Sequence, residues 1–445
     1  METEYQRLYR EKTIAPEKAL DFVPDGGVIV TGGAAQEPAT FFSRLHTIAP
    51  RITRPVQIYN TGSERVPPFQ YLTNPSCFGK FQSNPWFYMS GDRKAAPEIT
   101  SYTPVHYHGM TSRFPYERVN VFISGCTPMD RHGFVRLPLS LAFERQMMER
   151  ADIIIMEVNP NLPNVYGDNE VHISEIDYLY EVDTRLPMLP EIPLSETDMQ
   201  VGENVAKLVH DGDTIQLGIG AIPNSVAKAL TGKKDLGIHT EMLSSSVVEL
   251  AEKRVVTGRK KTLFPGKIVA AFAYGDAHLY DFMTENPCVY MMDAKTLNDP
   301  QIIAKNDNMV SINTCMQVDL TGQVSSETIG PRHYSGSGGQ NDTAEGAIHA
   351  RNGRSIIAVH ATKRGGTVST IVPMLEPGAV VSLSRNNLDY LVTEFGIADL
   401  RGRPVRQRVR ELVNVAHPRF RRELWQKALE FGMVTAYDPE PDFPE

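Results

Sequence analysis

Short apolar runs recur along this chain at intervals that leave room for a helix between them. In the first part of the sequence these runs cover residues 27–31, 56–59, 119–124 and 152–158. Helices are predicted between or before them at 5–22, 38–48 and 139–151. Strands buried on both faces read as continuous apolar runs, and strands alternating with helices are typical of a parallel sheet. The pattern therefore predicts an open α/β fold.

The alternation stops at a proline-rich stretch, residues 183–197, and then begins again. The later predicted strands are 214–217, 236–240, 268–273, 289–294, 309–314, 355–361 and 380–384, and two helices, 404–415 and 418–431, close the chain. Because 445 residues exceed one ordinary core, we predict two similar, open, mostly parallel α/β domains, residues 1–190 and 191–445.

A weak internal repeat supports this division. The segment DGGVIVTG at 25–32 aligns with DGDTIQLG at 211–218. Two halves built on one strand–helix plan would explain the match, although any such unit can share these features.

Composition and charge narrow the class of protein. A net charge of −8 gives no reason to expect nucleic-acid or membrane binding. No apolar run reaches the roughly 18 residues of a membrane span, and the charged N-terminal segment lacks the apolar core of a signal peptide. The four cysteines (Cys77, Cys126, Cys288 and Cys315) lie far apart without a CxxC motif. We therefore expect reduced thiols and a cytoplasmic protein.

Glu241 ends the predicted strand at 236–240, just before an amphipathic helix. Open α/β sheets place their ligands outside the carboxyl ends of the strands, which is where this carboxylate falls. A solvated carboxylate at a helix start is the plainer interpretation, and His239, two residues earlier, is more simply structural.

Two glycine-rich loops are candidates for close contact between backbone and ligand. The first, Gly218-Ile219-Gly220-Ala221-Ile222, joins a predicted strand to a helix, whose free N–H groups suit an anion or a polarised carbonyl. The second is Ser335–Gln340, which contains Gly338 and Gly339. Neither is a full GxGxxG or a P-loop, so a tight turn and a surface loop remain alternatives.

A few further groups are weaker candidates. His106 and His108 form an HxH pair, but no third ligand follows at suitable spacing, so we expect substrate contact or packing and no metal. The arginines between 401 and 422 are more simply a solvated face than a phosphate site. No GxSxG motif exists, which leaves a serine hydrolase without support.

Several motifs occur together in a characteristic order. They are GIHTEM (237–242), KKTLFPGKIV (260–269), YDFMTENP (280–287), AKNDNMVSINTCMQVDLTGQVSSETIG (304–330), GSGGQ (336–340), GTVSTIVP (366–373), VTEFGIADLRG (392–402) and AHPRFR (416–421). With PMDRHGF (128–134) and MEVNPNLPNVYGD (156–168), they make the chain resemble the acetyl-CoA hydrolase/transferase family. The resemblance is closest to the butyryl-CoA:acetate and 4-hydroxybutyrate CoA-transferases.

The resemblance implies ping-pong transfer of CoA through covalent intermediates on Glu241, with the active site in a cleft between the domains. An acyl-glutamyl anhydride forms first and a glutamyl-CoA thioester second. The two glycine loops would bind the oxyanions, and Met316 and, less firmly, Lys363 would contact CoA. Coenzyme A would be a substrate, with no permanently bound cofactor and no metal. We also expect a homo-oligomer, with no nucleic-acid or membrane partner.

The sequence departs from the family pattern beside the reacting centre. Ser244-Ser245-Ser246 replaces a serine followed by an acidic–glycine pair, and Asn341-Asp342-Thr343 replaces a hydrophobic residue, Asp and Phe. These changes suggest a substrate more polar than butyrate. His106, His108, Ser244 and Ser245 are candidates for the substrate pocket. An acyl-CoA hydrolase and a non-catalytic CoA-binding protein remain alternatives.

Overall fold

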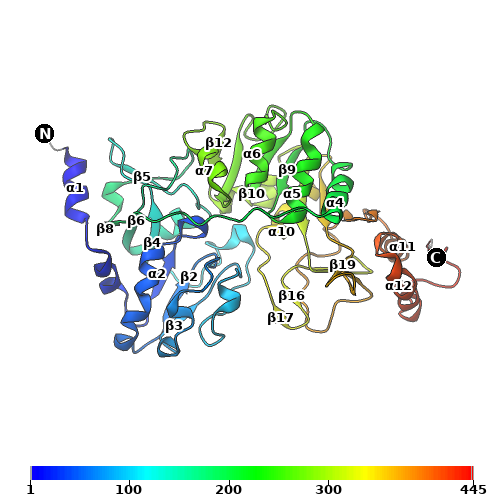
Figure 1. Ribbon diagram of the computed structural model, residues 1–445, viewed down its shortest axis with the longest axis horizontal. Helices are drawn as coiled ribbons and strands as arrows, with labels where there is room; N and C mark the ends of the chain where they lie inside the picture. The colour runs from blue at the N-terminus through cyan, green and yellow to red at the C-terminus, as the bar shows by residue number, and fades with distance from the viewer. Residues whose placement is uncertain (1–2, 442, 444–445) are drawn as a thin grey trace. The chain divides into compact units, whose positions relative to one another are not determined.

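The computed structural model describes residues 3–441 and 443, which fold into two compact units. The first unit contains residues 1–190 and 269–297, and the second contains residues 191–268 and 298–445 (Figure 1). Residues 269–297 thus join the first unit although they follow the predicted boundary at 190. Division into domains 1–190 and 191–445 stays a prediction.

A six-stranded parallel sheet forms the centre of the first unit. Its spatial order is β3-β2-β1-β4-β6-β8, and every pairing in it is parallel. The strands of the unit are β1 (Val28–Thr31), β2 (Val56–Tyr59), β3 (Phe81–Ser83), β4 (Val119–Cys126), β5 (Phe134–Arg136), β6 (Ala151–Val158), β7 (Glu170–His172), β8 (Tyr178–Glu181), β11 (Ile268–Ala273) and β12 (Val289–Met291). Its helices are α1 (Glu4–Lys12), α2 (Ala39–Leu45), α3 (Glu144–Met148), α7 (Ala277–Met283) and α8 (Ala294–Leu297).

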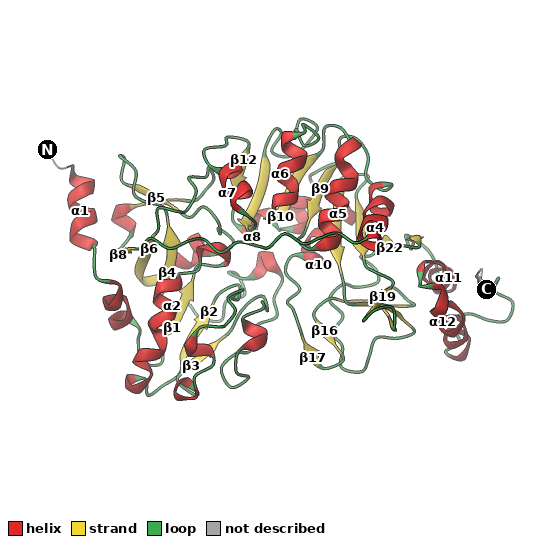
Figure 2. Ribbon diagram, in the orientation of Figure 1, coloured by secondary structure: helices red, strands yellow, loops and turns green. Residues whose placement is uncertain are grey.

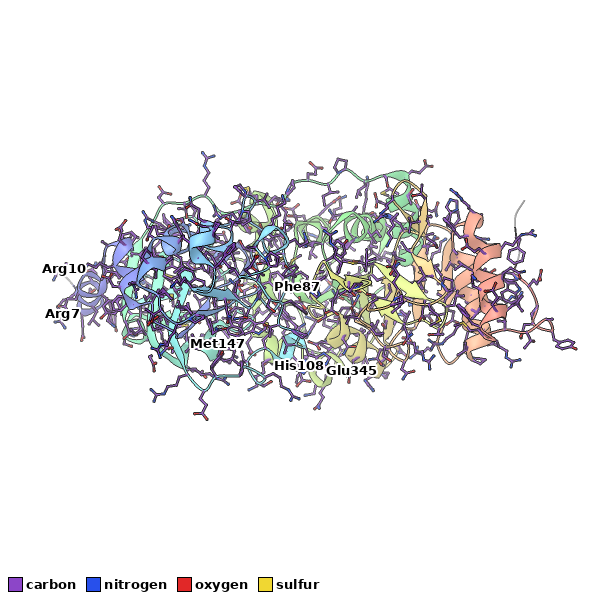
Figure 3. All side chains as sticks on the ribbon, turned by 90° about the horizontal axis from the view of Figure 1, so that it is seen from below. Arg7, Arg10, Phe87, His108, Met147 and Glu345 are labelled. Carbon is purple, nitrogen blue, oxygen red and sulfur yellow. The ribbon has the colours of Figure 1, made fainter. Side chains whose placement is uncertain are left out.

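Burial explains why the strands of this sheet are so apolar. All four residues of β1 are buried, and its neighbour β4 is buried at seven of eight positions. Helix α2 packs Phe41, Phe42 and Leu45 into the same core. Arg7 and Arg10 lie on α1, a helix without a buried residue (Figure 3).

A second, mainly parallel sheet organises the second unit. Within this unit its strands run in the order β10-β9-β13-β18-β22-β23, and among these six the β22–β23 pair alone is antiparallel. They are β9 (Thr214–Leu217), β10 (Gly237–Leu243), β13 (Met309–Thr314), β18 (Arg354–Ala358), β22 (Tyr390–Thr393) and β23 (Gly396–Asp399). Shorter strands lie outside it: β14 (Gln317–Asp319), β15 (Val324–Ser325), β16 (Thr328–Ile329), β17 (Arg332–His333), β19 (Thr362–Lys363), β20 (Val368–Ser369) and β21 (Ile371–Val372).

Seven helices belong to the second unit within the described residues. They are α4 (Glu196–Ala206), α5 (Ala221–Ala229), α6 (Ser245–Glu252), α9 (Pro300–Ile303), α10 (Gln340–His349), α11 (Val405–Val415) and α12 (Pro418–Glu430). Helix α5 packs between α4 and α6 (Figure 2), whereas α10 packs on α9, β13 and β18.

The two sheets share one strand plan. In each unit the first strand of the sheet is central, with the next strand of the chain on one side and a later strand on the other. Strand β1 lies between β2 and β4, and β9 lies between β10 and β13. These first strands are the two aligned DGxxIxxG segments, so the shared topology agrees with the predicted repeat.

One predicted helix is largely wrong. Only α3 forms within residues 139–151, because the preceding residues pair with β11 instead. The N–H of Leu141 donates to the carbonyl of Ala271 (2.9 Å), and the N–H of Ala273 donates to the carbonyl of Leu139 (3.0 Å). These bonds occupy backbone groups that a helix would use.

The strand predicted at 380–384 is also wrong. Val380 and Val381 are each 44% exposed, so this apolar run is not a buried strand. The β22–β23 hairpin ends the sheet instead. The helix predicted at 5–22 is interrupted after α1, and a 3₁₀ helix follows from Pro16 to Phe22. Proline lacks the N–H that would continue an α-helix.

Candidate active site

Glu241 lies within β10, which continues to Leu243 instead of ending before the carboxylate as predicted. Parallel pairing of β10 with β9 places Ile238 beside Ile215, and the hydroxyl of Thr240 donates to the carbonyl of Leu217 (3.3 Å). Continuing this register places Glu241 beside Gly218. The first glycine turn therefore begins next to the predicted nucleophile.

The second glycine loop contacts Glu241 directly. Gly339 precedes α10, and its backbone N–H hydrogen-bonds to the Glu241 carboxylate. A Cβ atom built on Gly339 would lie 2.0 Å from Glu241 Oε2 and 2.3 Å from the side-chain nitrogen of Asn298. Only glycine allows this close approach. The N-terminus of a helix also favours negative charge, so the loop stabilises an ionised Glu241.

Two further side chains at this site were not predicted to act there. Asn298, which follows α8, donates from its side-chain amide to Glu241 Oε2 (3.1 Å). Asp342, in the first turn of α10, is buried and interacts electrostatically with Glu241. Nothing in the local sequence marks Asn298, and Asp342 was noted only as part of a motif.

The surroundings of Glu241 shift its protonation. Burial of the carboxyl group, together with the negative charge of Asp342, raises the pKa of Glu241 to about 8. The donors Asn298 and Gly339 act in the opposite direction by stabilising the carboxylate. A larger share of Glu241 is therefore protonated at pH 7 than of a solvent-exposed glutamate. An ordinary glutamate with a pKa near about 4.3 would be ionised there.

The first glycine loop leaves its helix start open. Gly220 adopts a φ of +111°, a conformation that favours glycine, and no side chain caps α5. Ala221 and Ile222 form the first turn of this helix, and Ile219 is 42% exposed. The loop thus presents backbone donors beside the end of β10.

The serine cluster lies immediately after β10. Ser244 is buried, precedes α6 and does not cap it, because its hydroxyl instead lies 2.9 Å from that of Ser246. Ser245 begins α6 and is partly exposed. Ser244 and Ser245 therefore lie within four residues of Glu241 on the same strand–helix connection.

Of the two predicted CoA contacts, Lys363 has the more informative surroundings. Its ammonium nitrogen is buried without a hydrogen-bond partner in the described part of the chain, and burial lowers the pKa of Lys363. A buried cation of this kind is suited to an anionic ligand. Met316 lies between β13 and β14, half-buried, and its N–H donates to the carbonyl of Ser325 (2.9 Å).

His106 and His108 lie in the first unit with their rings stacked, 5.7 Å apart between centroids. Residues 3–441 and 443 contain no cluster of three or more His, Cys, Asp or Glu side chains that would bind a metal. No helix in the same residues is both long and apolar enough to cross a bilayer.

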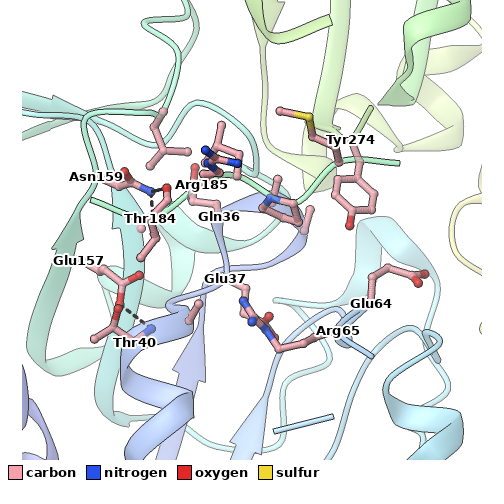
Figure 4. A pocket seen from close by; sticks show the side chains of 18 of the residues that line it. Gln36, Glu37, Thr40, Glu64, Arg65, Glu157, Asn159, Thr184, Arg185 and Tyr274 are labelled. Carbon is pink, nitrogen blue, oxygen red and sulfur yellow. Dashed lines mark hydrogen bonds between the residues drawn. The ribbon is translucent and has the colours of Figure 1, made fainter. Parts of the chain in front are cut away.

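A polar pocket of about 610 Å³ opens in the first unit, and the sequence did not predict it (Figure 4). It lies beyond the carboxyl ends of β1 and β4, where the strand order of the sheet reverses. Such a switch point is the usual ligand position in this type of sheet. Arg65 and Arg185 lie on its exposed rim, whereas His106 and His108 are not among its lining residues.

The interior of this pocket carries carboxyl groups. Burial raises the pKa of Glu37 to about 8, and burial also raises the pKa of Glu157. Glu157 accepts hydrogen bonds from the Tyr180 hydroxyl (2.8 Å) and the Thr40 N–H (3.0 Å). With arginines on its rim and buried carboxyl groups inside, the pocket suits a small polar ligand.

Comparisons with known proteins agree with the order of the motifs. Residues 1–190 match the acetyl-CoA hydrolase/transferase N-terminal domain, and residues 275–428 match the C-terminal domain of the same family. Glu241 lies between these ranges, in a part of the chain that whole-length relatives cover.

Curated and solved relatives extend over nearly the whole chain. A 4-hydroxybutyrate coenzyme A transferase of Clostridium kluyveri is 40% identical, over 95% of this chain and 98% of its own. A butyryl-CoA:acetate CoA-transferase of Anaerostipes caccae is 33% identical, over 95% and 97%. The crystal structure of RipA from Yersinia pestis matches with a TM-score of 0.90 at 32% identity, covering 97% of this chain and 100% of that one.

The raised pKa of Glu241 predicts a pH dependence for any reaction in which this residue is the nucleophile. Because only the ionised form attacks, kcat/KM should rise with pH up to about 8 and level off above it. Below that point it should fall about tenfold per pH unit. Initial rates from pH 5.5 to 9.5 test this, and a profile flat down to pH 5.5 would contradict it.

Asp342→Asn should shift the rise of kcat/KM to lower pH, because it removes a negative charge beside Glu241. Glu345→Gln is the matched control, since it neutralises a carboxylate three residues later on α10 (Figure 3). The control should leave the pH at which kcat/KM rises unchanged. An equal shift in both variants would assign the effect to net charge.

Gly339→Ala should inactivate the site without unfolding the protein. The new methyl group would displace the Glu241 carboxylate and Asn298, and a misplaced reacting group typically costs on the order of 100-fold in rate. Gly232→Ala is the control, because a Cβ there has no atom within 4 Å. Steady-state rates and thermal melting of both variants decide the matter, and wild-type activity in Gly339→Ala would refute the assigned contact.

Proposed function

Because the chain belongs to the acetyl-CoA hydrolase/transferase family, we propose that it is a CoA-transferase that acts on short-chain acyl-CoA. The donor is a butyryl- or 4-hydroxybutyryl-like thioester, and the acceptor is a small carboxylate such as acetate. The named activities of the relatives from Clostridium kluyveri and Anaerostipes caccae support these substrates. The hydrogen bonds to Glu241 support a reaction in which its carboxylate is the nucleophile.

One observation carries the proposal: a glutamate carboxylate is bound by a backbone N–H at the start of a helix and by Asn298. A carboxylate on the surface would need no glycine beside it. Here a Cβ atom at Gly339 would collide with it. The geometry therefore fixes one carboxylate oxygen while the residue remains partly accessible.

In the first half-reaction an oxygen of Glu241 attacks the thioester carbon of acyl-CoA. The carbon–sulfur bond breaks, giving an acyl-glutamyl anhydride and CoA thiolate. The thiolate then attacks the glutamyl carbonyl of the anhydride. This step forms a glutamyl-CoA thioester and releases the acyl group as its carboxylate.

The second half-reaction reverses these steps with another acid. The incoming carboxylate attacks the glutamyl thioester, CoA thiolate leaves, and an anhydride forms again. The thiolate attacks the acyl carbonyl, which gives the new acyl-CoA and regenerates the Glu241 carboxylate. Water must be kept from both intermediates, because either would hydrolyse.

Each attack develops negative charge on a carbonyl oxygen, which backbone donors can stabilise. The loops Gly218–Ile222 and Gly338-Gly339 are the candidates for this role. Loss of one such donor typically costs on the order of 100-fold in kcat. In our proposal Lys363 binds an anionic group of CoA, and Met316 contacts the same ligand. Binding energy from these remote groups is then available for the reacting carbonyl.

The proposed setting is the cytoplasm. All four cysteines are free, and Cys77 and Cys126 are buried, as suits a reducing compartment.

Whether turnover requires acetate distinguishes a CoA-transferase from an acyl-CoA hydrolase. With butyryl-CoA and labelled acetate, the wild type should form labelled acetyl-CoA, and Glu241→Gln should lower this rate by at least about 1,000-fold because it removes the nucleophile. Glu249→Gln removes an exposed carboxylate that pairs with Lys253 and should retain full activity.

Two results would contradict the proposal. Release of free CoA at the same rate without acetate identifies a hydrolase. Binding of acyl-CoA without any turnover, unchanged by Glu241→Gln, identifies a CoA-binding protein.

A further inference from the structure

A buried hydrogen-bond network connects the first turn of α10 to the ends of β9 and β13. The hydroxyl of Ser311, on β13, donates to that of Thr343, on α10 (2.9 Å). The side-chain amide of Asn313 donates to the hydroxyl oxygens of both Ser311 (2.9 Å) and Thr343 (3.2 Å). Thr343 and Ser311 are 2% and 0% exposed.

The hydrogen-bonding capacity of the Thr343 hydroxyl is fully used. It accepts from Ser311 and Asn313 and donates to the backbone carbonyl of Gln340 (3.3 Å). A hydroxyl has one donor and two acceptor positions, so no capacity is left for a substrate. Replacing it with a methyl group would remove the acceptor that lies 2.9 Å from the Ser311 hydroxyl and leave only Gln216 Oε1, at 3.5 Å. Loss of a buried acceptor is costly.

One further bond fastens the same turn to the sheet, and another ties β13 to β9. Gln340 donates from its side chain to the carbonyl of Thr314, at the end of β13 (2.8 Å). Gln216, on β9, accepts from the backbone N–H of Ile312 (3.2 Å). The start of α10 is therefore attached to β13, which is itself tied to β9, the strand beside β10.

The network reaches the candidate nucleophile through one residue. The backbone N–H of Thr343 donates to the carbonyl of Gly339 (2.9 Å), and the N–H of Gly339 bonds to Glu241. Thr343 therefore holds Gly339 through its carbonyl, and the N–H of the same glycine contacts the carboxylate.

We propose that Thr343, through its bonds to Ser311 and Asn313, is a positioning residue that fixes the Gly339 backbone donor against Glu241. Its catalytic meaning rests on the proposed function of Glu241. Thr343 touches no reacting atom and acts through Gly339. The departure from the family pattern at 343 is thus an internal one, because the hydroxyl faces β13 and is paired there. A substrate more polar than butyrate stays a prediction.

The test compares Thr343→Val with Thr343→Ser, which restores the hydroxyl, and with Thr393→Val. Thr393 is the matched control because it is also buried in the second unit and its hydroxyl donates to the carbonyl of Val415 (2.6 Å). All three are measured by thermal melting, by kcat, and by the pKa of the Glu241 carboxyl group. That pKa is read from the ¹³C signal of labelled glutamate that is missing in Glu241→Gln.

Thr343→Val should lower kcat about tenfold or more, because misalignment of the donor raises the barrier. It should also raise the Glu241 pKa, since a weakened bond from Gly339 stabilises the carboxylate less. Thr343→Ser should restore both quantities. Thr393→Val should lower the melting temperature while leaving kcat and the Glu241 pKa unchanged.

A Thr343→Val protein that melts earlier but keeps the wild-type kcat and Glu241 pKa would overturn the proposal and leave the network purely structural. The pKa measurement does not depend on turnover. It therefore tests the positioning role even if Glu241→Gln proves as active as the wild type, a result that would refute the proposed function alone.

Discussion

The contact between the Glu241 carboxylate and the backbone of Gly339 is the constraint on which the rest of the site depends. It requires a strand that delivers the carboxylate, a helix that begins opposite it, and a residue without a side chain at the junction. Glu241 and Gly339, which meet in this contact, are 98 residues apart in the chain. The parallel sheet brings them together because α10 leads from β13 to β18, and β13 pairs with β9, the neighbour of β10.

The same contact sets the electrostatic balance. Burial and Asp342 favour a neutral Glu241, whereas Gly339, Asn298 and the start of α10 favour its ionised form. A nucleophile needs the ionised form, and a site that protects an anhydride from water must be enclosed. These two demands conflict for a carboxylate. The hydrogen bond from the Gly339 N–H offsets part of the free-energy cost of burying the carboxylate. The position of α10 is important because it places this donor.

The sequence was most informative where burial on both faces makes a strand continuously apolar. Strands β2, β9 and β13 have the predicted bounds, and the predicted strand that leads to Glu241 forms as β10, although it continues through Glu241 to Leu243. Sequence was less informative where a residue's neighbours are distant in the chain. Leu139 and Leu141 look helical locally, yet they pair with β11. The apolar run at Val380-Val381 looks like a strand, yet it is exposed.

The residues of the candidate site also divide into those that a local motif predicts and those that depend on contacts with distant parts of the chain. Glu241 and the glycine loop at 338–339 could be proposed from the sequence because their motifs are local. Asn298 could not, because its role comes from folding next to β10 and no neighbouring residue signals it. Thr343 was interpreted as a change near the substrate, and only the positions of Ser311 and Asn313 show that it belongs to the interior.

Chemical trapping tests the central claim most directly. The protein is incubated with butyryl-CoA, reduced with borohydride, digested and mapped by mass. A thioester on Glu241 would be reduced to an alcohol, so the peptide containing residues 237–242 should carry the modification, and Glu241→Gln should show none. Modification of another peptide, or of none while the wild type turns over acyl-CoA, would contradict the assignment of Glu241 as the nucleophile.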